Sequence, residues 1–226
     1  VDDFIWNPTQ QTDSDGDGYG DNANGVPSDA FPNNPAQWQD SDGDGYGDNS
    51  NGSQGDAFPA DYTQWNDTDA DGFGDNWEDG DWNLSRAGWG IGTWLLTAST
   101  PDACPFIPGT SIGDRYGCTD TDGDGFSDGD LNWTKANGSD AFPLEPSQWQ
   151  DRDFDGWGDN QSEGALQVDF FPDNPTQWAN SDEDGWGDNQ SYGASQIDDF
   201  PFIDSQYRDT DGDGYGDNIA GFEADV

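Results

Sequence analysis

The acidic decapeptide DSDGDGYGDN occupies residues 13–22 and returns unchanged at residues 40–49. Each copy places four aspartates close together and contains no basic residue. At a separation of roughly 5 Å and an effective dielectric constant near 20, each pair of carboxylates repels by about 3 kcal/mol. A fold that includes such a segment therefore needs a compensating interaction, and the spacing of the aspartates indicates which one.

Related acidic motifs recur along the whole sequence. They begin at Asp13, Asp40, Asp67, Asp120, Asp151, Asn180 and Asp209, and we number them loops 1 to 7. Five segments between them share a second pattern, DAFPNNPAQW in the first case, and we call these segments connectors: residues 29–38, 56–65, 140–149, 169–178 and 198–207. Self-similarity at periods of 20–50 residues is typical of modular arrays in which each unit packs on its neighbours.

The spacing of the loops predicts the domain organisation. Successive loops start 27–31 residues apart, except that loop 4 starts 53 residues after loop 3. We therefore expect an array with loops 1–3 over residues 1–76, an insertion over 77–119, and a second array with loops 4–7 over 120–226. The insertion contains a tryptophan-rich apolar patch and both cysteines.

Composition excludes an ordinary hydrophobic core. Leu, Ile, Val and Phe make up 30 of the 226 residues, and the formal net charge is -44. Such values are typical of disordered chains, yet the sequence also holds 12 Trp, 13 Phe and 7 Tyr. Something other than aliphatic burial must hold the chain together.

The loop motif D-x-D-x-D-G-x-x-D matches the first part of an EF-hand calcium loop. There, side-chain oxygens at positions 1, 3 and 5 and the backbone carbonyl at position 7 bind the ion, and Gly at position 6 allows a sharp turn. Gly occupies position 6 in all seven loops. The motif therefore predicts about seven Ca²⁺ sites, each with ligands from positions 1, 3, 5, 7 and 9.

The predicted ligands, with position 7 contributing its carbonyl, are Asp13, Asp15, Asp17, Tyr19 and Asp21 in loop 1; Asp40, Asp42, Asp44, Tyr46 and Asp48 in loop 2; Asp67, Asp69, Asp71, Phe73 and Asp75 in loop 3; Asp120, Asp122, Asp124, Phe126 and Asp128 in loop 4; Asp151, Asp153, Asp155, Trp157 and Asp159 in loop 5; Asn180, Asp182, Asp184, Trp186 and Asp188 in loop 6; and Asp209, Asp211, Asp213, Tyr215 and Asp217 in loop 7.

The match to the EF-hand ends before position 12. Only loop 3 has the expected acid there, Glu78, and Gly and Pro flank the loops in place of helices. The missing ligand is predicted to be the aspartate that opens each connector: Asp29, Asp56, Asp140, Asp169 and either Asp198 or Asp199. The alternative is that these aspartates are turn formers or caps.

The loops resemble thrombospondin type 3 repeats and the wider group of such repeats in secreted bacterial and archaeal surface proteins. The resemblance covers the chain except roughly residues 77–101, and residues 102–130 are similar to a Cys-containing unit of the microbial repeats. It implies a calcium-stabilised tandem-repeat rod, mostly irregular, with little helix and short β segments at most. Type 3 repeats of animals carry a disulfide in nearly every unit, whereas this chain has two cysteines.

The aromatic residues have two interpretations. Each loop has an aromatic ring at position 7, and four of the five connectors end in Trp. We expect these rings to form a small core in each repeat, because aromatic side chains bury a large area each. The alternative is a platform that binds sugars.

Cys104 and Cys118 are predicted to form a disulfide, which indicates an oxidising extracellular or cell-surface location. The alternatives are free thiols or a zinc pair. N-glycosylation sequons, which predict covalent glycans, occur at Asn51, Asn66, Asn83, Asn132, Asn137, Asn160 and Asn189.

Function classes are narrowed by what the sequence lacks. It has no His, so His-dependent nucleophile systems are absent, and we expect no enzymatic activity. The charge disfavours binding to nucleic acid, and no apolar run is long enough to span a membrane. We expect a calcium-stiffened structural rod, as a fibril subunit or stalk of a cell-surface appendage. The alternative is an adhesin or carbohydrate-binding spacer that uses the aromatic residues of the insertion.

The two ends of the sequence suggest self-association. Residues 2–11 resemble a connector without a preceding loop, and loop 7 is followed by no connector. Joining two copies head to tail would give a loop spacing within the observed range and would offer Asp2 or Asp3 to loop 7. Two explanations fit: a segment cut in phase from a longer tandem polypeptide, or copies that complete each other's terminal repeat; the alternative is an arbitrary boundary. We expect the partner of the chain to be another copy of itself, head to tail, and a filament to result.

Overall fold

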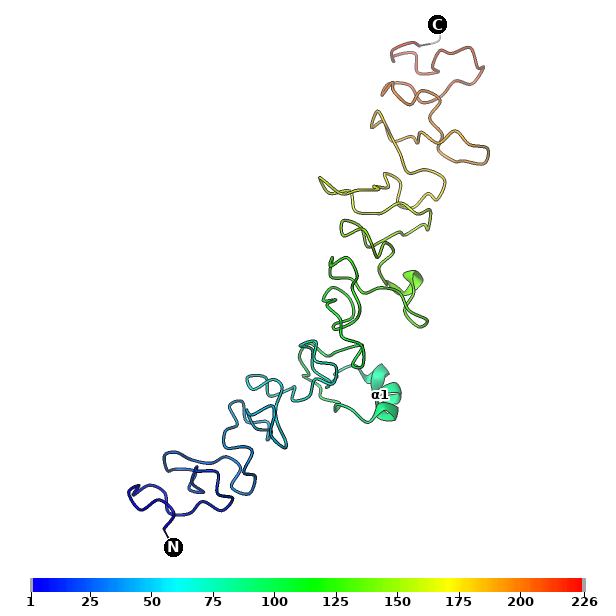
Figure 1. Cartoon of the computed structure of the whole chain (residues 1–226). Helices are drawn as coiled ribbons and strands as arrows, with labels where there is room; N and C mark the ends of the chain where they lie inside the picture. The colour runs from blue at the N-terminus through cyan, green and yellow to red at the C-terminus, as the bar shows by residue number, and fades with distance from the viewer. Residues whose placement is uncertain (1, 225–226) are drawn as a thin grey trace. The chain divides into compact units, whose positions relative to one another are not determined.

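The chain is almost free of regular secondary structure. The structure, a computed structural model, describes residues 2–224, without the side chain of residue 87. In that range the helical elements are η1 (Gly80–Trp82), α1 (Asn83–Trp89) and η2 (Lys135–Asn137). Figure 1 shows the remainder as a succession of irregular loops. The predicted fold class, mostly irregular with little helix, is confirmed.

Extended structure is limited to isolated parallel bridges, which recur at one place in the repeats. Six of those in residues 2–224 join the residue at position 8 of a loop to a residue further along the chain: Gly20 to Ser28, Gly47 to Gly55, Gly74 to Pro101, Gly158 to Val168, Gly187 to Ile197 and Gly216 to Ala224. In four of these bridges the residue that follows is the first residue of a connector, which therefore returns beside its loop: Asp29, Asp56, Asp169 and Asp198.

The chain divides into two compact units. One comprises the residues up to 110 together with 115–119, and the other comprises 111–114 together with the residues from 120 onward. The first unit contains loops 1–3 and α1, and the second contains loops 4–7.

The interior of the repeats is polar. Among the described side chains, the buried apolar ones are Trp77, Ala98, Cys118 and Ala141. The largest fully buried side chains include a glutamine from each of six repeats: Gln10, Gln37, Gln64, Gln148, Gln177 and Gln206. These glutamines lie next to last in their connectors.

Each buried glutamine locks the following loop through its carboxamide. In the second repeat, Gln37 Nε2 donates to the carbonyls of Asn49 (2.8 Å) and Ser53 (3.3 Å), and Gln37 Oε1 accepts from the Asn49 backbone N–H (3.0 Å). Asn49, at position 10 of the loop, returns a bond from Nδ2 to the Ala36 carbonyl (2.9 Å). A Cβ at Gly47 would overlap the Gln37 carboxamide, so position 8 must be glycine here. We call this arrangement the glutamine lock.

Aromatic rings pair in six of the seven repeats, those of loops 1 to 6. The ring at position 7 of a loop lies against the ring that ends the next connector, for example Tyr19 against Trp38 at 5.3 Å between centroids. The equivalent pairs are Tyr46–Trp65, Phe73–Tyr116, Phe126–Trp149, Trp157–Trp178 and Trp186–Tyr207. The rings that the sequence predicts to form a small core thus meet in pairs, and those of the first repeat, Tyr19 and Trp38, are half-buried.

The insertion folds around Trp77 and α1. Trp77 exchanges backbone hydrogen bonds with Thr93 and Leu95, and its Nε1 donates to Asn83 Oδ1 (2.9 Å). The helix α1 ends at Gly90, whose φ of 70° lies in the left-handed region that glycine favours. The extra residues fall between the bridged pair Gly74 and Pro101 and leave that bridge intact.

Candidate metal centres

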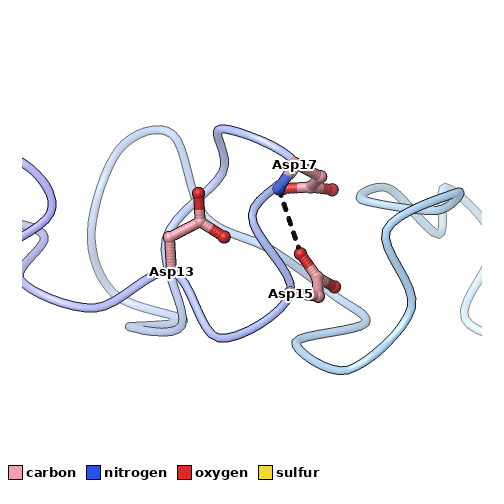
Figure 2. A group of neighbouring side chains, drawn as sticks. All are labelled: Asp13, Asp15 and Asp17. Carbon is pink, nitrogen blue, oxygen red and sulfur yellow. Dashed lines mark hydrogen bonds between the residues drawn. The ribbon is translucent and has the colours of Figure 1, made fainter.

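The aspartates at positions 1, 3 and 5 converge in loops 1 to 5. Ligand atoms of Asp13, Asp15 and Asp17 lie within 4.8 Å of one another (Figure 2), and the chain has seven acidic groups of this kind among its described residues. In loop 1, Asp13 accepts backbone N–H bonds from Gly16 (2.7 Å) and Gly18 (3.0 Å). These bonds fold the loop around its carboxylates.

Left-handed backbone at two positions makes the tight turn possible. Position 6 is Gly in every loop, with φ between 90° and 98°. Position 4 also has a positive φ, although loops 3, 5 and 6 place Ala70, Phe154 and Glu183 there. A non-glycine residue in this region costs roughly 1–2 kcal/mol, so the surrounding contacts hold these three positions in place.

The aspartate that opens each connector lies beside the triplet of the preceding loop, and we call it the closing aspartate. Asp29 donates its backbone N–H to the Gly20 carbonyl (2.9 Å), and its Oδ1 accepts from Phe31 N–H (2.6 Å). Its Oδ2 is buried without a hydrogen-bond partner. Asp56, Asp140, Asp169 and Asp198 repeat this arrangement and are equally buried.

Burial raises the pKa of the closing aspartates above the usual range. The pKa of Asp56 and of Asp198 rises to about 6, and that of Asp140 and of Asp169 to about 7. Desolvation is the largest cause, a backbone hydrogen bond opposes it, and the carboxylates of the adjacent loop raise the pKa further. These carboxylates therefore lie in a place that lacks positive charge.

The donor set fits a hard divalent cation. In loop 1, Oδ2 of Asp15, of Asp17 and of the closing Asp29 are all buried without hydrogen-bond partners. Loop 6 presents Asn180 Oδ1 in the same state. Several buried, unpartnered oxygens at one place match the six to eight oxygen ligands that Ca²⁺ takes. The loops can thus hold metal ions, and their chemistry is consistent with Ca²⁺.

Loop 3 has a closing aspartate that the sequence analysis missed. Asp102 donates its N–H to the Gly74 carbonyl (2.9 Å), and its Oδ1 accepts from Cys104 N–H (2.6 Å). Burial, reinforced by Asp71 and Asp69, raises its pKa to about 8. The signal was the segment DACP, which aligns with DAFP of the connectors but lies 27 residues beyond Asp75.

The aspartate at position 9 makes a different contact. Both oxygens of Asp21 accept bonds from Ser14 at position 2, from its N–H (3.0 Å) and its Oγ (2.6 Å). The same clamp recurs in loops 2, 3, 4, 6 and 7. This contact fastens the loop ends together, and the ligand role of position 9 stays a prediction.

Loop 7 is more exposed than the other loops, and its Tyr215 ring is 53% exposed. A bridge joins Gly216 to Ala224, and the next residue in the sequence, Asp225, lies outside the described residues. At the other end, Asp2 Oδ1 accepts from Phe4 N–H (3.0 Å), as a closing aspartate does.

The sequons fall into two groups. Asn51, Asn66, Asn83, Asn132 and Asn137 are exposed. Asn160 and Asn189 instead occupy position 10, where Nδ2 donates to Ser147 and Thr176 carbonyls at 2.8 Å within the glutamine lock. Glycan attachment at these two would compete with that contact, and glycosylation of the chain stays a prediction.

The predicted disulfide between Cys104 and Cys118 is present, with Cα atoms 5.0 Å apart. This bond is compatible with an extracellular protein. Within residues 2–224, none of the helices has the length and apolar character needed to cross a membrane.

No family model matches the chain, and no curated protein matches it either. The likeness to thrombospondin type 3 repeats therefore rests on the loop motif alone. What the structure adds is that the repeated aspartate triplets are arranged compatibly with calcium-binding loops.

Proposed function

We propose that the chain is a non-enzymatic structural protein whose thrombospondin type 3-like repeats fold around about seven Ca²⁺ ions. The closing aspartates carry this proposal. Each brings a buried carboxylate oxygen without a hydrogen-bond partner to a triplet that is already crowded with negative charge. Burying an uncompensated carboxylate costs free energy. A bound calcium ion would compensate the negative charge, and the loop would then favour the ion-bound state. Where little apolar core exists, metal binding energy is folding energy.

Calcium dependence can be measured on the full chain. We expect calorimetry to give about seven bound Ca²⁺, and we expect a chelator to abolish the near-UV circular dichroism of the paired rings. Calcium should restore that signal better than magnesium, which demands near-ideal octahedral geometry and retains its waters. A near-UV spectrum that does not change in excess chelator would contradict the proposal.

A matched pair of variants tests the closing aspartate itself. Asp169→Asn keeps the shape of a closing residue but removes its charge, and we expect the affinity of site 5 to fall at least tenfold, about 1.4 kcal/mol. The control is Asp173→Asn in the same connector, whose side chain is 80% exposed and pairs with Arg152. Equal calcium titrations for both variants would show that Asp169 is a turn former.

The structural role that we propose is a calcium-stiffened rod outside the cell, as a stalk or fibril subunit that associates head to tail. The disulfide supports the location. Asp2 supports the association, because its Oδ1 accepts from Phe4 N–H as a closing aspartate does. Electron microscopy of calcium-loaded protein should show unbranched fibres that fall apart on chelation, whereas dispersed monomers at high concentration would contradict head-to-tail association.

A second candidate function is ligand recognition by the insertion. Leu84 is 93% exposed, and the rings of Trp89 and Trp94 are 43% and 46% exposed. Exposed apolar groups gathered on one segment are typical of interaction sites, and aromatic faces suit carbohydrates. Binding on a glycan array that is lost in Trp89→Ala and Trp94→Ala would favour an adhesin, and an array without signal would leave only the structural role.

A further inference from the structure

Arg86 is the one basic residue that is buried among the described residues, with 1% of its surface exposed. It lies in α1, and its guanidinium carbon lies over three tryptophan rings: Trp77 at 5.7 Å, Trp82 at 5.0 Å and Trp89 at 5.2 Å. Cation–π contacts strengthen when the cation is removed from water. The insertion thus encloses a positive charge inside a protein that has five basic residues against 49 acidic ones.

The guanidinium faces the third metal centre. Arg86 Nη2 donates a hydrogen bond to the backbone carbonyl of Asp102, the closing aspartate of loop 3. The carboxylates of Asp102 and Asp75 both interact electrostatically with Arg86. Its Nη1 is buried without a hydrogen-bond partner. The Arg86 side chain that contacts Asp102 therefore makes few other hydrogen bonds.

We number each repeat by the loop that it contains. Repeats 5 and 6 make the equivalent contact with a neutral side chain. Gln161 Nε2 donates to the Asp169 carbonyl (2.6 Å), and Gln190 Nε2 donates to the Asp198 carbonyl (2.8 Å). In each case the acceptor is the carbonyl of a closing aspartate. Repeat 3 therefore differs from repeats 5 and 6 by one full positive charge at the same place, beside the same kind of carboxylate cluster.

Repeat 3 also has stabilising interactions that do not require a metal ion. The disulfide joins Cys104, two residues after Asp102, to Cys118. Three of the four buried apolar residues of the described chain, Trp77, Ala98 and Cys118, lie in or beside the insertion. Repeats 2, 5 and 6 have the glutamine lock and a ring pair, whereas repeat 3 adds a covalent bond and these buried apolar side chains.

From these contacts we propose that Arg86 is a positioning residue that fixes Asp102 and supplies a permanent positive charge to site 3, so that repeat 3 keeps its fold without calcium. The inference rests on the proposed function, since it assumes that the other repeats need the ion. Removing calcium leaves each cluster with mutually repelling carboxylates, and in repeat 3 the guanidinium offsets part of that repulsion. The same charge repels an incoming cation, so site 3 binds Ca²⁺ more weakly than its neighbours.

Hydrogen exchange with mass spectrometry on the full chain tests the proposal, in calcium and in excess chelator. The repeat 3 peptides are residues 64–76 and 100–119, and the reference peptides are residues 37–56 and 148–169. We expect protection throughout in calcium, and retained protection only in repeat 3 after chelation. Protection that persists in every repeat would contradict the proposed function, whereas loss in all repeats alike would contradict this inference alone.

Arg86→Gln removes the charge and leaves the disulfide and the buried apolar side chains in place. Gln is chosen because repeats 5 and 6 have it at this contact. We expect it to speed exchange of repeat 3 in chelator by about ten- to a hundredfold, the scale of one charged hydrogen bond, and to tighten calcium binding at site 3. A merely structural residue would not tighten that site. Arg152→Gln, which removes an exposed arginine, should change neither quantity in repeat 3.

Arg86→Lys keeps the positive charge but removes the planar guanidinium group. This variant provides the test if Arg86→Gln does not fold in calcium. We expect the lysine variant to retain weak calcium binding at site 3 while it loses part of the protection in chelator. An unchanged calcium affinity in Arg86→Gln, or a tightened one in Arg86→Lys, would overturn the role assigned to the charge.

Discussion

At the scale of single residues, buried amides replace the aliphatic side chains of an ordinary core. The Gln37 carboxamide is fully buried, and its hydrogen bonds all end on the backbone of the next loop or of its flanking segment. A buried polar group is favourable only when it is hydrogen-bonded, and it becomes costly as soon as one partner is lost. The stability of a repeat should therefore be sensitive to a change of one atom in this side chain.

Gln37→Glu makes that change. The carboxylate keeps the shape of the amide but turns two donors into an acceptor that faces the Asn49 and Ser53 carbonyls. We expect it to destabilise the calcium-loaded repeat by about 3 kcal/mol, as a buried, unpaired charged group does. Thermal unfolding in saturating calcium measures the effect.

The control is Gln39→Glu, two residues on, because the Gln39 side chain is exposed. If both variants unfolded at the same temperature, the glutamine lock would not contribute to stability.

At the scale of the repeat, the paired rings couple one loop to the connector that follows it. Phe126 and Trp149 stack with their planes 2° apart and their centroids 5.1 Å apart. The pair thereby connects loop 4 to the end of the connector that leads into loop 5. Ring pairs of this kind add about 0.5–1.5 kcal/mol beyond the area they bury, so neighbouring repeats should unfold cooperatively.

Trp149→Ala removes one such pair. Full burial of Trp is worth about 3–5 kcal/mol on truncation to Ala, and because this ring is half-buried we expect a loss of about 2 kcal/mol. Chemical denaturation in calcium measures it, with Trp6→Ala as the control because the Trp6 side chain is 95% exposed. Equal midpoints for the two variants would show that the ring pairs do not hold the repeats.

At the scale of the whole molecule, charge dominates. The chain carries a formal net charge of -44, and each aspartate triplet therefore lies in a negative field. Salt shortens the range of that field, from about 30 Å at 0.01 M to about 3 Å at 1 M ionic strength. Calcium should therefore be attracted to the molecule far more strongly in dilute buffer than in concentrated salt.

We expect the mean calcium affinity to fall about tenfold between 0.01 M and 1 M NaCl, the size of a screened interaction between a divalent ion and a few distant carboxylates. Competition with a fluorescent chelator gives the affinity at each salt concentration. Circular dichroism at saturating calcium should be the same at both, since the loaded fold is held by short contacts. An affinity that is independent of salt would mean that each site acts alone.

The aspartate triplets and the irregular fold were predictable because both depend on the spacing of residues that are close together in the sequence. The pattern D-x-D-x-D-G fixes which oxygens converge, and Gly and Pro around the loops exclude long helices. The cysteine pair was equally local. These predictions needed only neighbours within a short stretch of chain.

The remaining features depend on contacts through space. Gln37 and Asn49 are ordinary surface residue types, and nothing in the sequence shows that they bury each other. Asp21 falls in the acidic motif, and its ligand role stays a prediction, but its hydrogen bond from Ser14 is visible only in the folded loop. Asp102 was missed because the insertion separates it from its loop and hides the register of the repeat.

The bridge between position 8 and the residue before the closing aspartate spans different lengths of chain, from Gly20 to Ser28 in one repeat and from Gly74 to Pro101 in another. The ends of that span are fixed to each other, so whatever lies between them can lengthen without moving the carboxylates. A repeat can therefore accommodate additional sequence at this point, as repeat 3 accommodates residues 77–100. The same point is where a foreign peptide could be grafted for display, since long insertions between anchored ends add little entropic cost.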